Sequence, residues 1–199
     1  MDALLGIYGC SARPIKATSP DSQQVDLSIW SAKAKAWEPL CTGLRLCSDG
    51  WWWSDAQPRA QYRWEQAEGR RYLLARETAT AGHYGVATPV AQQMQRAPAP
   101  LPPQWSARLG STWLLANEAP DSIPLAMGVG AATLQELPDL PGYLFWDDSQ
   151  FLRPLSADRA GMAVQVPHNA GRDLVELVVH THDKDEWMHA AGWVYRRHD

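Results

Sequence analysis

The 199-residue chain has no apolar run near the length of about 18 residues that a membrane-spanning helix needs. Its short N-terminal apolar stretch follows an acidic residue, Asp2, and lacks the basic region of a secretory signal. Cysteine is scarce, since Cys10, Cys41 and Cys47 form an odd set without a Cys-x-x-Cys pair, which argues against a disulfide framework or a structural zinc site. We therefore expect a cytoplasmic protein without a membrane partner.

Motifs of nucleophilic catalysis and phosphate-binding loops are also missing. The sequence has no Gly-x-Ser-x-Gly, and Gly128-Val129-Gly130 lacks the third glycine of a dinucleotide-binding loop. The three cysteines lie in apolar contexts that are typical of buried side chains rather than of nucleophiles. The sequence therefore favours a binding protein over an enzyme.

The net charge of −4 is divided unevenly along the chain. Residues 1–108 hold 12 basic and 9 acidic side chains, whereas residues 109–199 hold 6 basic and 13 acidic ones. The chain can therefore present a basic face without a basic total, although ordinary fluctuation of charge along a sequence explains the asymmetry equally well.

Tryptophan is abundant, with 11 residues against 2 phenylalanines, while 15 prolines and 14 glycines interrupt most windows long enough for a helix. Short apolar runs separated by turn residues predict strands. These runs lie at 4–8, 26–30, 43–47, 50–53, 61–65, 71–76, 112–116, 143–146, 151–155, 162–166, 174–181 and 192–196. The expected fold is mainly β, or α+β with few short helices, built on an antiparallel, short-stranded sheet that resembles a barrel or a sandwich.

Two segments break this pattern and predict short helices, at 86–96 after Pro89 and at 130–137 before Pro138. Between them, residues 97–103 read APAPLPP, a composition typical of a stiff, extended linker. We expect residues 1–199 to form a single domain, and this linker is the best candidate for an internal boundary.

Basic and aromatic residues alternate in the segment 59–76, which reads RAQYRWEQAEGRRYLLAR. Arginine for phosphate and rings for base stacking are typical of surfaces that bind single-stranded RNA. The simpler alternative is a β-hairpin whose arginines pair with glutamates across the strands.

Just upstream, alternation along a strand places Trp52 on the opposite face from Trp51 and Trp53, and we expect a partner subunit to cover one of these faces. The predicted RNA- or partner-binding residues are Arg59, Arg63, Trp64, Arg70, Arg71, Trp52, Arg196 and Arg197.

Histidines and carboxylates gather near the C-terminal end of the sequence. His180 and His182 alternate on one predicted strand and project from the same face, with Asp185 close by. A His-x-His pair with a carboxylate can hold zinc, and the spacing resembles that of the JAB/MPN metallo-isopeptidases. A zinc hydrolase that uses these three residues is therefore one alternative.

The simpler interpretation of the same region is a hairpin that binds no metal and no cofactor. It predicts strands at 174–181 and 188–196, joined by a solvated acidic turn at 183–186. We favour this interpretation, in which the histidines are polar residues on an exposed strand face.

Four short motifs follow one another along the chain. They are Cys47-Ser48-Asp49-Gly50-Trp51, Tyr143-Leu144-Phe145-Trp146, GMAVQVP at 161–167, and VVHTHDKDEW at 178–187 followed by Arg196 and Arg197. In this order they resemble the small accessory subunit of type III-D CRISPR effector complexes. The resemblance covers mainly residues 140–199, with a fainter similarity at 40–55.

This resemblance implies a non-catalytic subunit of a prokaryotic, RNA-guided ribonucleoprotein in antiviral defence. Its expected partners are other protein subunits of the effector complex, with guide RNA as a further candidate. It implies no catalytic residues and no cofactor. A stand-alone immunity or inhibitor protein is a third alternative, since small, acidic, Trp-rich chains serve in that role.

Overall fold

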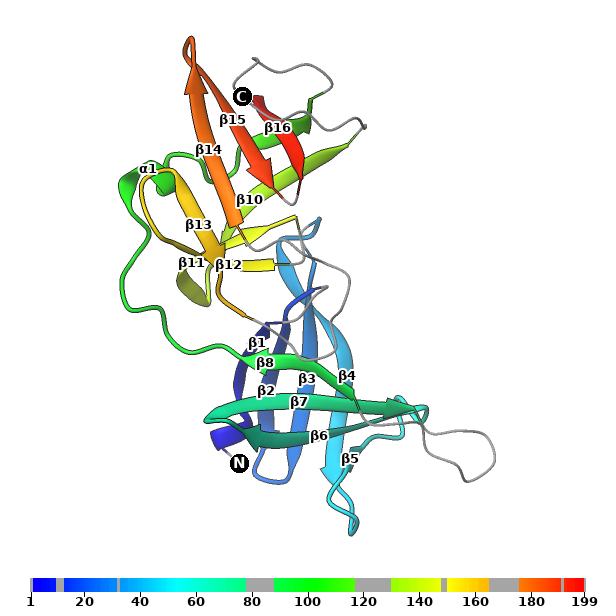
Figure 1. The fold of residues 1–199 in the computed structure, drawn as a ribbon. Coiled ribbons are helices and arrows are strands. Elements are labelled where there is room, and N and C mark those ends of the chain that lie inside the picture. The colour runs from blue at the N-terminus through cyan, green and yellow to red at the C-terminus, as the bar shows by residue number, and fades with distance from the viewer. Residues whose placement is uncertain are drawn as a thin grey trace. The chain divides into compact units, whose positions relative to one another are not determined.

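The computed structural model describes residues 2–9, 13–31, 33–77, 88–116, 130–147, 150–164, 176–190 and 192–198. The chain forms two compact units, and the change from the first to the second falls between Gln95 and Arg96. Each unit contains a closed antiparallel barrel of eight strands, and Figure 1 lets the chain be followed through both. The expected mainly β, antiparallel and barrel-like fold is confirmed.

The first barrel is a meander in which each strand pairs with the next one in the sequence, and β1 closes the ring by pairing with β8. A single turn of 3-10 helix, η1 (Asp2–Leu4), precedes it. Its strands are β1 (Gly6–Gly9), β2 (Ile15–Asp21), β3 (Gln24–Ser31), β4 (Ala36–Leu46), β5 (Trp52–Trp53), β6 (Ala60–Ala67), β7 (Arg70–Glu77) and β8 (Thr88–Gln93).

The second barrel has the same plan, because β9 pairs with both β10 and β16 and so joins the first strand to the last. A short helix, α1 (Pro103–Ser106), precedes it. Its strands are β9 (Thr112–Leu115), β10 (Ala131–Leu137), β11 (Leu140–Trp146), β12 (Gln150–Pro154), β13 (Arg159–Met162), β14 (Glu176–His182), β15 (Asp185–Ala190) and β16 (Trp193–His198). The two halves therefore share one architecture, a helical turn followed by an eight-stranded meander.

Alternation along the strands directs apolar side chains into each barrel. In β14, for example, Leu177 and Val179 are buried in the core of the second barrel. The interior of the first barrel includes Tyr8, Val25, Leu27, Leu44, Trp52 and Leu73, and that of the second includes Trp105, Trp113, Leu134, Leu144, Leu152 and Met188. Each barrel is thus a packed core that holds its outer side chains on a rigid frame.

Two tight turns explain where the long hairpins reverse. Glu68 and Gly69, between β6 and β7, have φ angles of 51° and 72°, and Asp183 and Lys184, between β14 and β15, have φ angles of 49° and 81°. Two consecutive positive φ angles are the mark of a type I′ turn, whose twist matches that of antiparallel strands. The predicted acidic turn at 183–186 is therefore too long, because β15 begins at residue 185.

The two predicted helices are strands. The described part of 86–96, from residue 88 onward, contains β8, and 130–137 contains β10. Both segments are rich in residues that favour helices, but β8 pairs with β1 and β7 to close the barrel, and β10 buries Ala132 and Leu134 in alternation. Hydrogen bonding along both edges of a strand outweighs a helix propensity of roughly a few tenths of a kcal/mol per residue.

The proline-rich segment 97–103 belongs to the second unit and leads directly into α1. It lies against β11, because a Cβ atom on Gly142 would clash with the backbone carbonyl oxygen of Ala99. The backbone N–H of Gly142 also donates a hydrogen bond to Glu136 Oε1 at 2.6 Å. The segment is thus packed on its barrel.

Among the described residues, no helix has the length and apolar character that crossing a bilayer requires. Some residues singled out in the sequence lie outside the described ranges: Cys10, Val129 and the last three residues of the 161–167 motif.

Candidate functional site

Two of the predicted site residues, Arg63 and Arg70, lie on the outer face of the β6–β7 hairpin. Because Tyr62 and Leu73 belong to the barrel interior, alternation points Arg63 of β6 and Arg70 and Arg76 of β7 outward. The predicted pairing of arginines with glutamates across the strands does not occur among the described residues of this hairpin. Arg63 instead pairs with Glu65 on its own strand.

Trp51 organises this outer face. Its indole is 4% exposed and packs with Tyr72 and Leu74 of β7. The guanidinium carbon of Arg76 lies 3.9 Å from the centroid of the Trp51 ring, and that of Arg63 lies 4.7 Å from it. Both distances are within the range of cation–π attraction, so one buried ring orients two arginines.

The turn that precedes Trp51 fixes its position. Asp49 Oδ1 accepts a hydrogen bond from the backbone N–H of Trp51 at 3.2 Å, and Asp49 Oδ2 accepts one from Arg76 at 2.9 Å. Gly50 has a φ of 82°, a left-handed conformation that only glycine adopts without steric cost. Arg76 Nε also donates to Gln61 Oε1 at 2.7 Å. Arg76 is therefore tied into the frame of the site.

The other predicted arginines of this hairpin differ in accessibility. Arg59 and Arg70 are exposed, and neither side chain forms a hydrogen bond or an ion pair with another residue of the ranges that the structure describes. The Arg63 side chain is 37% exposed. Arg71 lies on the opposite face of β7, where its Nη1 donates to Gln93 Oε1 at 3.4 Å. Arg59, Arg63 and Arg70 can therefore contact an external anion.

The aromatic rings of the predicted set lie inside the barrel. Trp52 packs in the core and meets Trp64 edge to face, with 5.6 Å between the ring centroids. This corrects the expectation that Trp52 presents its ring to a partner. Burial also raises the pKa of Tyr62 to about 12. Trp53 is half-buried, and its Nε1 donates to the Pro58 carbonyl oxygen at 3.5 Å.

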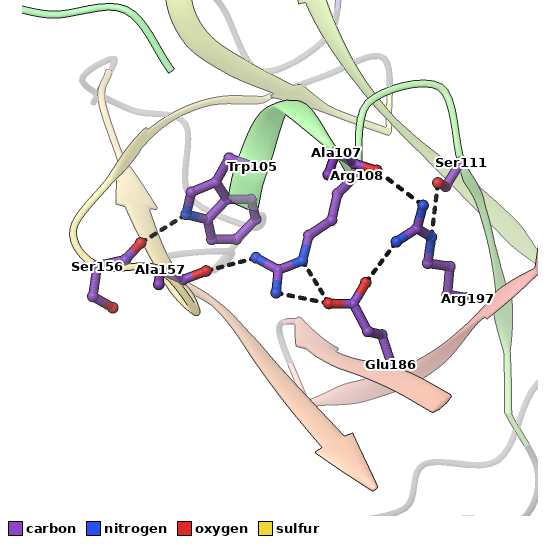
Figure 2. A network of polar contacts seen from close by, with 8 residues as sticks. All are labelled: Trp105, Ala107, Arg108, Ser111, Ser156, Ala157, Glu186 and Arg197. Atoms are coloured by element: carbon purple, nitrogen blue, oxygen red, sulfur yellow. Dashed lines mark hydrogen bonds and ion pairs between the residues drawn. The ribbon is translucent and has the colours of Figure 1, made fainter. Parts of the chain in front are cut away.

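The two predicted arginines near the C-terminal end lie in the second barrel, and both are paired. Arg196 lies 2.6 Å from Asp185 Oδ2 and stacks over Trp187, with 5.5 Å from its guanidinium carbon to the ring centroid. Arg197 belongs to a polar network around Glu186, which Figure 2 shows.

Glu186 is the centre of that network. Its Oε1 accepts hydrogen bonds from Nε and Nη2 of Arg108 at 2.9 and 2.7 Å, and its Oε2 accepts one from Arg197 at 2.8 Å. Burial alone would raise the pKa of Glu186, but the hydrogen bonds from the two arginines lower it below its ordinary value. Glu186 is therefore an ionised, partly buried carboxylate and does not lie in the solvated turn expected from the sequence.

The same network joins α1 to the barrel strands. Arg197 donates to the Ala107 carbonyl oxygen at 2.9 Å, just after α1. Trp105 of α1 is fully buried in the barrel core, and its Nε1 donates to the Ser156 carbonyl oxygen at 2.7 Å. Every group shown in Figure 2 is satisfied by a neighbour within the chain, so we assign this network to stability rather than to ligand binding.

The histidines of the alternative zinc site lie on β14. Across the strands His180 pairs with Trp187 and His182 pairs with Asp185, whose carboxylate is bound to Arg196. Within the described part of the chain, no three His, Cys, Asp or Glu side chains lie close enough together to hold a metal ion.

Comparison of the chain with protein-family models, curated proteins and solved structures gives no match. Functional inference therefore depends on the residues themselves and on the motifs quoted above.

Proposed function

We propose that the chain is a non-catalytic binding subunit of a prokaryotic type III CRISPR effector complex, and that the outer face of β6–β7 contacts RNA in that complex. The observation that carries the proposal is the group of accessible guanidinium groups on a closed barrel, Arg63 and Arg70 on the hairpin and Arg59 in the turn directly before β6. Because Trp51 and Glu65 already restrain the Arg63 guanidinium, that group loses little conformational freedom when it binds phosphate.

A second observation supports the same face. The motif Cys47-Ser48-Asp49-Gly50-Trp51, which contributes to the resemblance, is the turn that holds Trp51 against Arg63 and Arg76. The residues behind the resemblance and the residues that build the arginine face are therefore partly the same.

Local charge also favours a polyanionic partner. The segment 59–76 holds five arginines and two glutamates, of which Glu65 is paired with Arg63, while Asp49 is paired with Arg76 and Glu77 ends β7. Electrostatic attraction depends on the charges within about 10 Å at moderate salt, so a net charge of −4 for the chain does not oppose binding at this face.

For contacts with protein subunits, the proposal points to the outer face of the second barrel. Leu114, which is exposed, lies directly opposite Arg196 in the pairing of β9 with β16. An apolar side chain beside an arginine that already stacks on Trp187 is a combination common in protein interfaces.

The test is reconstitution of the effector complex with charge-reversed chains. The variant Arg59→Glu with Arg70→Glu is expected to reduce RNA crosslinking to this subunit at least about tenfold without a change in melting temperature, because neither arginine has a partner to lose. The matched control is Arg153→Glu with Lys184→Glu, which reverses two cations of the second barrel and is expected to leave crosslinking unchanged. Equal crosslinking by both variants and the native chain would overturn the proposal.

A further inference from the structure

We infer that the β6–β7 face binds single-stranded RNA through the phosphodiester backbone alone and does not distinguish between bases. This inference rests on the proposed function and specifies its ligand. It follows from which chemical groups of the hairpin are accessible and which are already engaged inside the barrel.

Base stacking requires an accessible ring face, and the rings of this hairpin do not offer one. Trp52 and Tyr62 belong to the barrel core, and Trp64 packs against it. Tyr72 and Trp51 pack with each other on the outer face and are both buried.

Trp51 positions an arginine and does not contact the RNA itself. Its ring is engaged by the guanidinium groups of Arg63 and Arg76, so a nucleobase could stack there only by displacing an arginine. Trp51 is therefore a positioning residue that orients Arg63, and its own ring contacts no ligand.

The accessible groups are guanidinium donors spread along the hairpin. Arg63 and Arg70 project from the same outer face, and because Arg70 pairs with Ala67, four residues beyond Arg63 on β6, the two lie about 13 Å apart along the strands. Guanidinium forks match phosphate oxygens in geometry and charge. A single strand laid along the hairpin would therefore present successive phosphates to successive arginines.

Glu65 opposes this contact, because its carboxylate already occupies Arg63 and faces the same side of the hairpin. A phosphate must displace it before Arg63 can contribute fully. Removing the negative charge at position 65 should therefore strengthen RNA binding.

Counterion release gives the expected salt dependence. Three phosphate contacts to a single strand predict that log K falls against log salt concentration with a slope of about −2, and loss of one contact reduces the slope by about 0.7. Affinity should not depend on base identity, because every nucleotide carries the same phosphate.

The experiment measures binding of the full chain to labelled oligo(U), oligo(A) and oligo(C) of about 12 nucleotides, a length within the usual range for one binding face. Fluorescence anisotropy is recorded between about 50 and 200 mM salt. We expect the three affinities to agree within about threefold, Arg70→Gln to reduce the slope by about 0.7, and Glu65→Gln to raise affinity at least twofold, as order-of-magnitude expectations. Trp53→Ala should have no effect, although the Trp53 ring is only half-buried.

The outcomes separate this inference from the proposed function. A preference of more than about tenfold for one base, or loss of binding in Trp53→Ala, would overturn backbone-only recognition and leave an RNA-binding subunit in place. Failure to bind any of the three oligonucleotides would overturn the inference. In that case, release of the subunit from the reconstituted complex by Arg59→Glu with Arg70→Glu would identify an acidic protein as the partner of this face.

Discussion

Replacement of Glu186 by alanine removes the one carboxylate that joins Arg108, just after α1, to Arg197 on β16. The three side chains are largely withdrawn from solvent, with exposures of 19% for Glu186, 9% for Arg108 and 23% for Arg197. The substitution therefore leaves two cations without their shared counter-ion in a region that water reaches poorly.

The expected cost follows from these contacts. Removing one partner of a buried ion pair costs about 3–5 kcal/mol, and a hydrogen bond to a charged group contributes about 1.5–3 kcal/mol. Arg108 keeps the Ala157 carbonyl oxygen, and Arg197 keeps Ser111 and the Ala107 carbonyl oxygen. We therefore expect the lower end of that range, about 3 kcal/mol for Glu186→Ala and about 2 kcal/mol for Glu186→Gln, whose amide oxygen still accepts one hydrogen bond.

The measurement is urea unfolding of the full chain, with hydrogen exchange of the β15 and β16 amides as the readout for the second barrel. Asp183→Asn is the matched control, because Asp183 lies three residues away in the turn and its side chain is 91% exposed. It should change the free energy of unfolding by no more than about 0.5 kcal/mol.

The pH dependence gives an independent check. The pKa of Glu186 is lower in the folded chain than in the unfolded chain, where it is about 4.3. Its contribution is therefore fully present above the unfolded value and is lost as pH falls through the folded value, so the difference between native and Glu186→Gln should shrink in acid. A loss below about 1 kcal/mol at neutral pH, or a difference that stays constant down to acid pH, would refute a stabilising role for the network.

Three further predictions concern packing. Gly142→Ala should destabilise the second barrel by about 2 kcal/mol or more, because the new methyl group clashes with the segment before α1 and because Gly142 has a φ of 88°. Gly130→Ala, which has open space around it, should not destabilise the barrel, and thermal unfolding compares the two variants. Trp52→Ala should cost about 3–5 kcal/mol in urea unfolding of the isolated chain, and a loss under about 1 kcal/mol would show that the ring is not core. Burial raises the pKa of the Cys41 thiol, so at mildly alkaline pH iodoacetamide should label Cys47 faster than Cys41, as peptide mass spectrometry would show; equal rates would contradict the burial of Cys41.

Strands with a strong local signature could be predicted from the sequence. The aromatic and aliphatic runs at 71–76 and 143–146 lie within β7 and β11, because their own side chains supply the buried faces. β10 could not be predicted in this way, since its sequence favours a helix and only the neighbouring strands β9 and β11 make it extended. β2 could not be predicted from the sequence either, because its second half is polar and contains Pro20.

The candidate site was only partly predictable, for a related reason. The alternation of side-chain direction along a hairpin is a local pattern, so Arg63 and Arg70 could be recognised from the sequence as members of one candidate site. The direction in which Trp52 points depends on how the whole barrel closes, which no local pattern contains. Arg108 and Glu186 are 78 residues apart, and a pair so distant carries no signal in one sequence except that Glu186 lies two residues before inward-facing Met188, on the same face of β15.

In each barrel, the first and last strands are hydrogen-bonded neighbours, since Tyr8 pairs with Gln93 and Thr112 pairs with His198. The polypeptide therefore enters and leaves each barrel at a single seam, and the two ends of the module emerge side by side. A module of this kind can be grafted into a surface loop of a host protein with little separation between the insertion points. We also expect it to tolerate circular permutation, with new termini opened at a two-residue turn such as that of Glu68 and Gly69.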